Sequence, residues 1–155
     1  MILFLFGLLV GLMIYFIYTK CEKSKFRKEN IPLKLIERSK DIIYYYELKP
    51  VYKHRYTSPS IDFFLGEGTL DALNKNSNMP FVMIHPDDEE IMFQKTSGKI
   101  NYNEGIIQRL KGTDGVYKWF EEYTTPIYEN GEIVAVQGIM RNIDKKVKLE
   151  QDLQY

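Results

Sequence analysis

Cysteine and histidine are scarce in this chain of 155 residues, which holds one cysteine, Cys21, and two histidines, His54 and His85. A single cysteine excludes an internal disulfide framework. The chain also lacks the Cys/His spacing of zinc sites, a glycine-rich phosphate loop and the turn that carries a hydrolase nucleophile. With these catalytic patterns missing, we predict that the chain is not an enzyme and that it binds no metal.

Charge is absent from residues 1–19, an apolar run interrupted only by Gly7 and Gly11. A helix needs about 20 apolar residues to cross a bilayer, with roughly 17 as the lower limit. The run therefore predicts an N-terminal transmembrane helix. The alternatives are a buried core helix and a cleaved signal peptide, which should have a basic residue before the run and small residues at a cleavage site after it. Neither feature of a signal peptide is present.

Basic residues concentrate directly after this run. Residues 20–40 contain eight Lys or Arg and three Glu, a net charge of +5, whereas the whole chain has 21 basic and 21 acidic residues. The positive-inside tendency then predicts a single-pass protein of the cell membrane whose C-terminal domain is cytoplasmic. Residues 20–40 would form a juxtamembrane connector helix, either paired with its copy in a dimer or solvated as a basic linker. The balanced overall charge predicts no nucleic-acid partner.

Two turn signals divide the β-rich segment Ile106–Asp144 into three runs. They are Asp114-Gly115 and Asn130-Gly131, dipeptides that readily take positive φ at both turn positions of a hairpin. The segment predicts a three-stranded antiparallel meander. Upstream of it, the pattern predicts two further strands and several helices: strands over 42–48 and 51–57, and helices over 58–66, 69–74 and 86–95, with a polar loop between 74 and 80. The result is an α+β fold of five strands with short helices on one face.

The acidic string His85-Pro86-Asp87-Asp88-Glu89-Glu90 has two interpretations. It could be a metal or acid/base cluster. It could also be a helix start, because proline suits the first turn and acidic residues there complement the helix dipole. Carboxylates of adjacent helical residues diverge, so we favour the helix start.

Several strings in this part of the chain resemble the PAS sensor family with its C-terminal PAC portion, in the order in which that family has them. The resemblance covers about residues 41–150 and implies a PAS/PAC domain over 41–144, with a five-stranded antiparallel sheet around a small internal pocket. It also implies that residues 145–155 begin a C-terminal signalling helix. The strings are YTSPSIDFFLG (Tyr56–Gly66), IHPDD (Ile84–Asp88), QRLKGTDGVYKW (Gln108–Trp119), ENGEIVAVQG (Glu129–Gly138) and NID (Asn142–Asp144).

Pocket walls should come from the inward phase of the sheet and from the helices that face it. The residues assigned to the pocket are Phe64, Phe81, Met92, Ile107, Tyr123 and Ile139. The residues assigned to signal coupling are Trp119, Asn142 and Asp144. Relatives often end the last strand in Asp-Ile-Thr, whereas this chain has Asn142-Ile143-Asp144. Trp119 could instead stack a flat ligand, although packing of a sheet face is the favoured interpretation. No cofactor is identified, and haem or covalent flavin is not expected, because neither histidine nor Cys21 stands where relatives place such ligands.

The resemblance implies a membrane-anchored, cytoplasmic sensor or interaction module in signal transduction, which binds a small ligand or a protein and transmits through its flanking helices. Expected partners are membrane lipid through residues 1–19, a second copy in a homodimer, and a histidine kinase or a cyclic-dinucleotide signalling protein. Two alternatives remain open: an N-terminal sensory fragment of a longer histidine kinase or diguanylate cyclase, and a ligand-free dimerisation adaptor.

Overall fold

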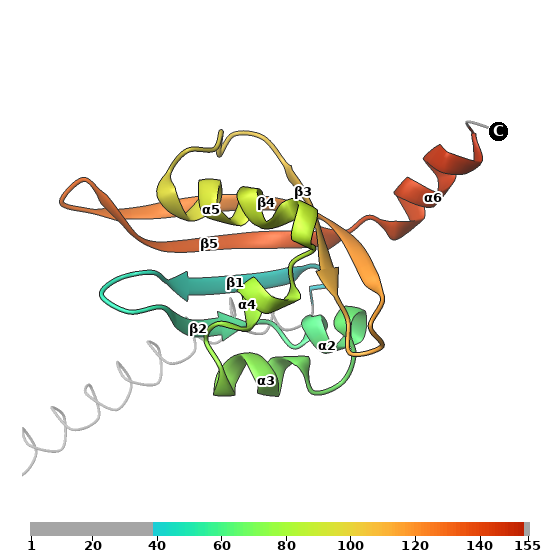
Figure 1. Ribbon diagram of the computed structural model, residues 1–155, viewed down its shortest axis with the longest axis horizontal. Coiled ribbons are helices and arrows are strands. Elements are labelled where there is room, and N and C mark those ends of the chain that lie inside the picture. Colours follow the sequence, from blue (N-terminus) through green and yellow to red (C-terminus); the bar gives the residue numbers. More distant parts are fainter. Residues whose placement is uncertain (1–38, 154–155) are drawn as a thin grey trace, which may run out of the picture. The chain divides into compact units, whose positions relative to one another are not determined.

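Five antiparallel strands form one sheet in the order β2-β1-β5-β4-β3 (Figure 1). The computed structural model describes residues 39–153. The strands are β1 (Ile42–Glu47), β2 (Lys53–Thr57), β3 (Ile106–Lys111), β4 (Tyr117–Glu129) and β5 (Glu132–Asn142). The first strand, β1, pairs with the last, β5. This pairing joins the N-terminal hairpin of β1 and β2 to the three C-terminal strands in one sheet. The predicted α+β fold with five antiparallel strands is confirmed.

The two glycine turns join neighbouring strands, as the sequence predicts. At the β4–β5 turn, Asn130 and Gly131 both have positive φ, of 50° and 81°. The β3–β4 turn differs, because only Gly115 has positive φ there. Asp114 instead accepts a hydrogen bond from the backbone N–H of Val116 at 2.9 Å, which satisfies the turn through its side chain. The expectation of positive φ at both positions is thus wrong for Asp114.

Short helices connect β2 to β3 and lie against one face of the sheet (Figure 1). They are α2 (Ser60–Leu65), α3 (Thr69–Lys75), α4 (Met79–Met83), the 3₁₀ turn η1 (Pro86–Asp88) and α5 (Glu89–Ser97). Helix α4 replaces the end of the predicted polar loop. Before α2, the Ser58 hydroxyl accepts a hydrogen bond from the N–H of Ile43 at 2.9 Å and so ties the chain to β1.

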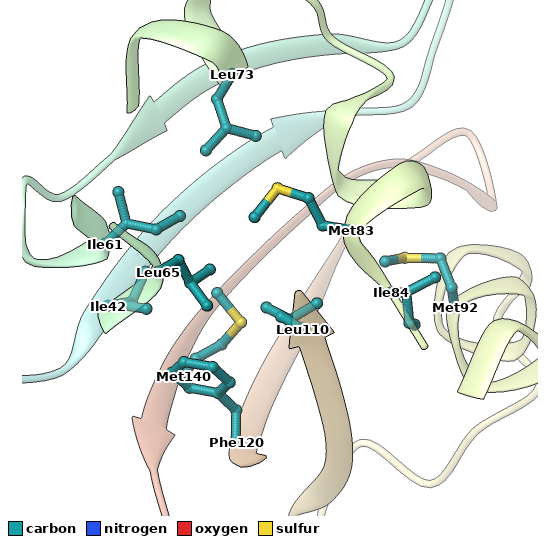
Figure 2. Packing of buried hydrophobic residues seen from close by; sticks show 10 residues of the cluster. All are labelled: Ile42, Ile61, Leu65, Leu73, Met83, Ile84, Met92, Leu110, Phe120 and Met140. Carbon is teal, nitrogen blue, oxygen red and sulfur yellow. The ribbon is translucent and has the colours of Figure 1, made fainter. Parts of the chain in front are cut away.

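The hydrophobic core lies between the sheet and these helices. Figure 2 shows side chains from α2, α3, α4 and α5 converging on residues of β1, β3, β4 and β5. Phe120 and Ile42 have no exposed surface at all. The buried cluster consists of Ile42, Ile61, Leu65, Leu73, Met83, Ile84, Met92, Leu110, Phe120 and Met140.

Helix α6 (Asp144–Asp152) follows β5 directly and carries no buried residue. It occupies most of the segment in which the sequence predicts the start of a signalling helix. The predicted transmembrane helix over 1–19, and the connector over 20–40 except for its last two residues, lie outside the described residues. Within residues 39–153, every helix is too short or too polar to span a bilayer.

Candidate ligand cavity

A cavity of about 70 Å³ lies between the inner face of the sheet and helices α2 to α5. A cavity that holds benzene measures roughly 150 Å³, so this one suits a molecule of a few non-hydrogen atoms or a few waters. Most of its wall is apolar. The apolar lining residues are Ile61, Leu73, Pro80, Phe81, Met83, Met92, Leu110, Val136 and Met140.

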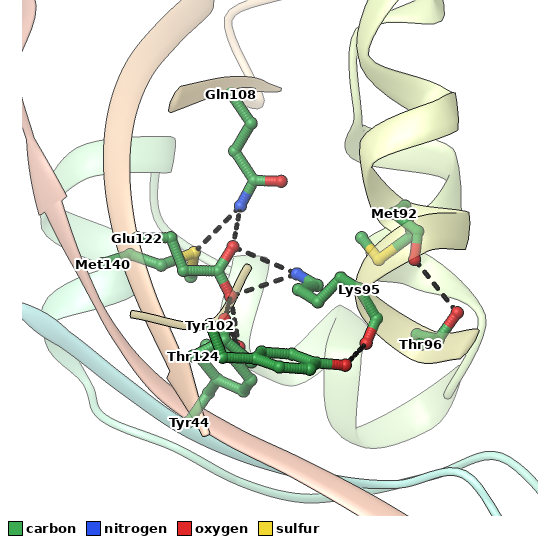
Figure 3. Close-up of polar contacts among 9 residues, drawn as sticks. All are labelled: Tyr44, Met92, Lys95, Thr96, Tyr102, Gln108, Glu122, Thr124 and Met140. Carbon is green, nitrogen blue, oxygen red and sulfur yellow. Dashed lines mark hydrogen bonds and ion pairs between the residues drawn. The ribbon is translucent and has the colours of Figure 1, made fainter. Parts of the chain in front are cut away.

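A buried carboxylate, that of Glu122 on β4, forms the polar centre of the wall (Figure 3). Glu122 is 0% exposed, because β4 alternates and Phe120, Glu122 and Thr124 share its inward phase. Its Oε1 accepts hydrogen bonds from the hydroxyls of Tyr44 and Thr124, the latter at 2.7 Å. A buried ionised carboxylate is costly unless it is paired and hydrogen-bonded, and Glu122 meets both conditions.

Lys95 supplies the positive charge. It lies on α5 three residues after Met92, on the same side of the helix, and is only 4% exposed. Its Nζ donates to both carboxylate oxygens of Glu122, at 3.1 Å and 3.0 Å. The pair therefore fixes α5 to β4 through a contact from which water is excluded. Burial raises the pKa of Tyr44 well above its ordinary value, and the Glu122 charge contributes further in the same direction.

Gln108 on β3 completes the centre and is 1% exposed. Its Nε2 donates to Glu122 Oε2 and lies 3.7 Å from the sulfur of Met140. This contact fixes the orientation of the amide, since a carboxylate accepts hydrogen bonds and cannot bond the Gln oxygen. The amide oxygen Oε1 is buried and has no hydrogen-bond partner among residues 39–153. Gln108 thus presents a free acceptor at the cavity wall.

His54 and Tyr46 line the opposite, β1–β2 side of the cavity. His54 is half-buried, and its Nε2 lies 2.8 Å from Thr57 Oγ1. Burial lowers the pKa of His54, so its neutral form is favoured. Burial also raises the pKa of Tyr46 to about 12; its hydroxyl donates to the carbonyl of Ser77. Both side chains are neutral wall residues near pH 7.

A second polar cluster lies at the start of η1. Asp88 accepts hydrogen bonds from the backbone N–H and Nε of Arg109 at 2.8 Å and 2.9 Å, and its other oxygen accepts from Nη2 at 2.8 Å. The Arg109 guanidinium holds the pKa of Asp88 below its ordinary value. His85 caps η1 by accepting from the N–H of Asp87 at 3.1 Å. The string is a helix start bonded to β3, and no group of three potential metal ligands occurs in the described part of the chain.

The six residues that the sequence assigned to the pocket have three different positions in the structure. Phe81 and Met92 line the cavity. Phe64 does not line it, but packs edge-on against Phe120 in the neighbouring core, with ring centroids 6.0 Å apart. A different result holds for Ile107, Tyr123 and Ile139, which are 40%, 52% and 44% exposed.

The assignment of Ile107, Tyr123 and Ile139 to the pocket is wrong, because their side chains point to the outer face of the sheet and not to the face that lines the cavity. Tyr123 pairs with Ile139 across β4 and β5. Each lies one residue away from a buried neighbour, Glu122 or Met140. Side chains alternate between the faces of a sheet, so a choice one residue off moves a whole row to the outer face.

The three residues assigned to coupling come together where β4 and β5 meet α6. Asp144 accepts a hydrogen bond from the Trp119 N–H at 2.7 Å and another from the Asn142 amide at 2.8 Å. The Trp119 carbonyl accepts from the N–H of Ile143 at 2.9 Å. The Trp119 ring lies beside the guanidinium of Arg109, 5.0 Å from its centroid, and does not line the cavity. The first residue of α6 is therefore bonded to the backbone of β4.

Sequence reasoning missed all four polar residues of the cavity centre: Tyr44, Lys95, Gln108 and Glu122. A signal for one of them was present, because Gln108 lies between Ile106 and Leu110 in a single strand phase. A polar residue flanked at i−2 and i+2 by apolar ones points into the core. Glu122 follows Phe120 in the same way, but the adjacent pairs Trp119-Phe120 and Glu121-Glu122 place one aromatic and one acidic residue in each strand phase, so the pattern does not select the inward one.

Comparisons with known proteins agree with this architecture. Residues 69–140 match the family model of the PAS fold. Among solved structures, an RNA-binding light-oxygen-voltage receptor superposes with a TM-score of 0.61 at 16% identity, covering 81% of this chain and 36% of that one. A sensory-box histidine kinase/response regulator from Burkholderia thailandensis E264 gives a TM-score of 0.59 at 15% identity, with 77% and 88% covered.

The N-terminal domain of a diguanylate cyclase with a PAS/PAC sensor from Marinobacter aquaeolei gives a TM-score of 0.52 at 19% identity, covering 68% of this chain and 97% of that one. No curated protein sequence matches the chain. Identities at this level show a shared fold. This chain spans about a third of the light-oxygen-voltage receptor and nearly all of the cyclase domain.

Proposed function

Because residues 69–140 match the family model of the PAS fold, we propose that the chain is a sensory module in signal transduction that binds a small molecule in the cavity around Glu122. The observation that supports this proposal is a buried charged pair placed in the wall of a mostly apolar cavity. Ligand sites are typically concave and apolar with a few oriented polar groups. We propose a sensory role for this cavity and no reaction.

Transmission would run along β4. Glu122 faces the cavity, and three residues away the Trp119 N–H is bonded to Asp144 at the start of α6. A ligand that changes the position of Glu122 or Lys95 would shift β4 and α5 together and alter the support of α6. A ligand biases such an equilibrium only through different contacts in the two states, and the Lys95–Glu122 contact is the element that we expect to differ.

We further propose that residues 1–19 anchor the module in the cell membrane with the PAS-fold domain in the cytoplasm. The domain would act as a homodimer on a histidine kinase or a cyclic-dinucleotide signalling protein, either in trans or as part of the same longer chain. The support is the apolar run followed by basic residues, together with the histidine kinase and diguanylate cyclase among the solved structures that share the fold. Deleting residues 1–19 should move the chain from the membrane fraction to the soluble fraction.

A ligand-free dimerisation adaptor is the second candidate. It is favoured by apolar side chains on the outer face of the sheet, and by the exposed side chains of Leu149 on α6 and Leu153 at its C-cap. For this function the cavity would be incidental. Sedimentation of the full chain with Tyr123→Ser and Leu153→Ser variants would measure whether these surfaces hold a dimer.

Native mass spectrometry of the purified full chain tests the sensory proposal. We expect a bound small molecule, and we expect its loss in a Met83→Trp variant, because the larger side chain would fill the cavity. Val82→Trp is the matched control, since Val82 is adjacent and exposed. A chain that carries no small molecule and is unchanged by Met83→Trp in its dimerisation and signalling would favour the adaptor.

A further inference from the structure

We propose that the cavity selects a small, neutral molecule that carries a hydrogen-bond donor, with the Gln108 amide oxygen as the group that recognises it. The inference rests on the proposed sensory function and names the chemical class of the ligand. Its basis is a set of polar atoms in the cavity wall, only one of which is an acceptor without a partner among residues 39–153. Short-chain primary amides and alcohols have this chemistry.

The free acceptor cannot be removed by turning the amide. Gln108 Nε2 faces the Glu122 carboxylate, and a flipped amide would place its oxygen against a carboxylate oxygen. In Figure 3 the Gln108 oxygen points away from Glu122, towards the space beside α5. A buried acceptor without a partner is unfavourable, so a ligand N–H or O–H that reaches it gains more than the same group would gain from water.

The charges around Gln108 determine the charge of the ligand. The single positive charge of Lys95 is balanced by Glu122 through contacts to both carboxylate oxygens, at 3.1 Å and 3.0 Å. An anionic ligand would be repelled by the negative charge of Glu122 and would face the Gln108 amide oxygen, which is also an acceptor. A cationic ligand would meet the Lys95 ammonium. A neutral ligand avoids both penalties.

Lys95 supplies a complementary contact. An ammonium group has three N–H donors, and among the described residues two of them are directed at Glu122. The third can donate to a carbonyl or hydroxyl oxygen of the ligand. The site therefore pairs an acceptor on β3 with a donor on α5, which matches a group that both donates and accepts. The apolar side chains of Leu73, Met83 and Met92 would cover a short alkyl tail.

The size of the cavity limits the tail. At about 70 Å³ it holds less than half of the roughly 150 Å³ that accommodates benzene. Molecules of four or five non-hydrogen atoms are the appropriate probes. Such small ligands bind weakly, since the free energy available per atom is limited, so the test compares affinities within one series.

Three probes of five non-hydrogen atoms separate the possibilities: propionamide, butanone and propionate. Propionamide offers a donor and an acceptor, butanone only an acceptor, and propionate a negative charge. Each is titrated into the full chain while the amide and methyl NMR signals are recorded. We expect a dissociation constant for propionamide at least tenfold lower than those for butanone and propionate. Equal binding of propionamide and butanone, or tighter binding of propionate, would overturn the inference.

A variant pair assigns the effect to Gln108. Gln108→Leu should reduce propionamide affinity to the level of butanone and leave butanone affinity within twofold. Gln94→Leu makes the same chemical change on the outward side of α5 and should leave both affinities unchanged. Retention of the propionamide preference in Gln108→Leu would overturn the assignment.

Failure of this inference is distinct from failure of the sensory function. A different bound molecule in native mass spectrometry, together with no preference for propionamide, rejects the ligand class and keeps the sensor. No bound molecule and no saturable response to any of the three probes, with Gln108 Oε1 hydrogen-bonded only to ordered water in a crystal structure, rejects both.

Discussion

Two of the ion pairs that join the segment Pro86–Ser97 to the sheet have both partners largely buried, and they differ in what surrounds them. Asp88 and Arg109 lie at the edge of the domain, where every oxygen of the carboxylate is bonded by one arginine and its backbone N–H. Lys95 and Glu122 lie in a cavity wall beside the Gln108 amide oxygen, an acceptor that has no partner among residues 39–153. The first arrangement is complete as a structural contact. The second leaves the Gln108 amide oxygen in the cavity wall available to accept a hydrogen bond, as expected of a binding site.

The largest difference between the pairs should appear when one partner is removed. Lys95→Met leaves the Glu122 carboxylate buried without a cation, which should lower the free energy of unfolding by about 3–5 kcal/mol. Adding Glu122→Leu should recover most of that loss, because an apolar pair can replace a buried ion pair. Urea unfolding followed by circular dichroism measures both.

Lys99→Met is the control for this experiment, since Lys99 is exposed near the end of the same helix and should change stability by less than about 0.5 kcal/mol. If the double variant is as unstable as Lys95→Met alone, the buried charge is not the cause of the loss.

Asp88→Asn should have a smaller effect, about 1–2 kcal/mol. The substitution keeps the shape and one acceptor oxygen, and water reaches part of the Arg109 side chain, which reduces the value of the charge. The same unfolding measurement applies. A loss as large as that of Lys95→Met would mean that the two pairs are equivalent, contrary to the comparison.

The effect of pH sharpens the comparison further. The folded-state pKa of Asp88 is below its ordinary value of 3.8, so its contribution to stability is complete above that value and is lost as pH falls through the folded pKa. The stability difference between the unmodified chain and Asp88→Asn should therefore be constant between pH 5 and 7, and shrink below about pH 4. A difference that grows on acidification would contradict the depressed pKa.

Salt should change the stability cost of these substitutions least of all. Raising the ionic strength from about 0.1 M to 1 M shortens the screening length from roughly 10 Å to 3 Å. The stability cost of Asp88→Asn should decrease slightly, by less than about 1 kcal/mol, whereas the cost of Lys95→Met should not change because solvent ions do not reach the pair. Equal sensitivity of both variants would show that Glu122 is open to solvent.

The sequence was sufficient for the sheet and insufficient for the cavity, for one physical reason. Turn signals such as Asn130-Gly131 are local, and they led to the correct pairing of β4 with β5. The inward phase of a strand depends on what lies opposite it. Tyr123 and Ile139 are large and apolar, so binary patterning predicts that they lie inside, yet they lie on the outer face.

Glu122 is a charged residue on the inward face of β4, where binary patterning expects an apolar one. It is buried because Lys95, 27 positions earlier in the chain, lies opposite it on α5. A sequence can break the local pattern where a site requires it. The fold brings these two residues together, and neither spacing nor composition along the chain indicates the contact.

The most direct test is a high-resolution crystal structure of the full chain purified without added ligands. It should show density for a non-protein molecule in the cavity, within hydrogen-bond distance of Gln108 Oε1 and beside an intact Lys95–Glu122 pair. A collapsed cavity, with that oxygen bonded to another group of the protein, would contradict the claim that these residues form a ligand site.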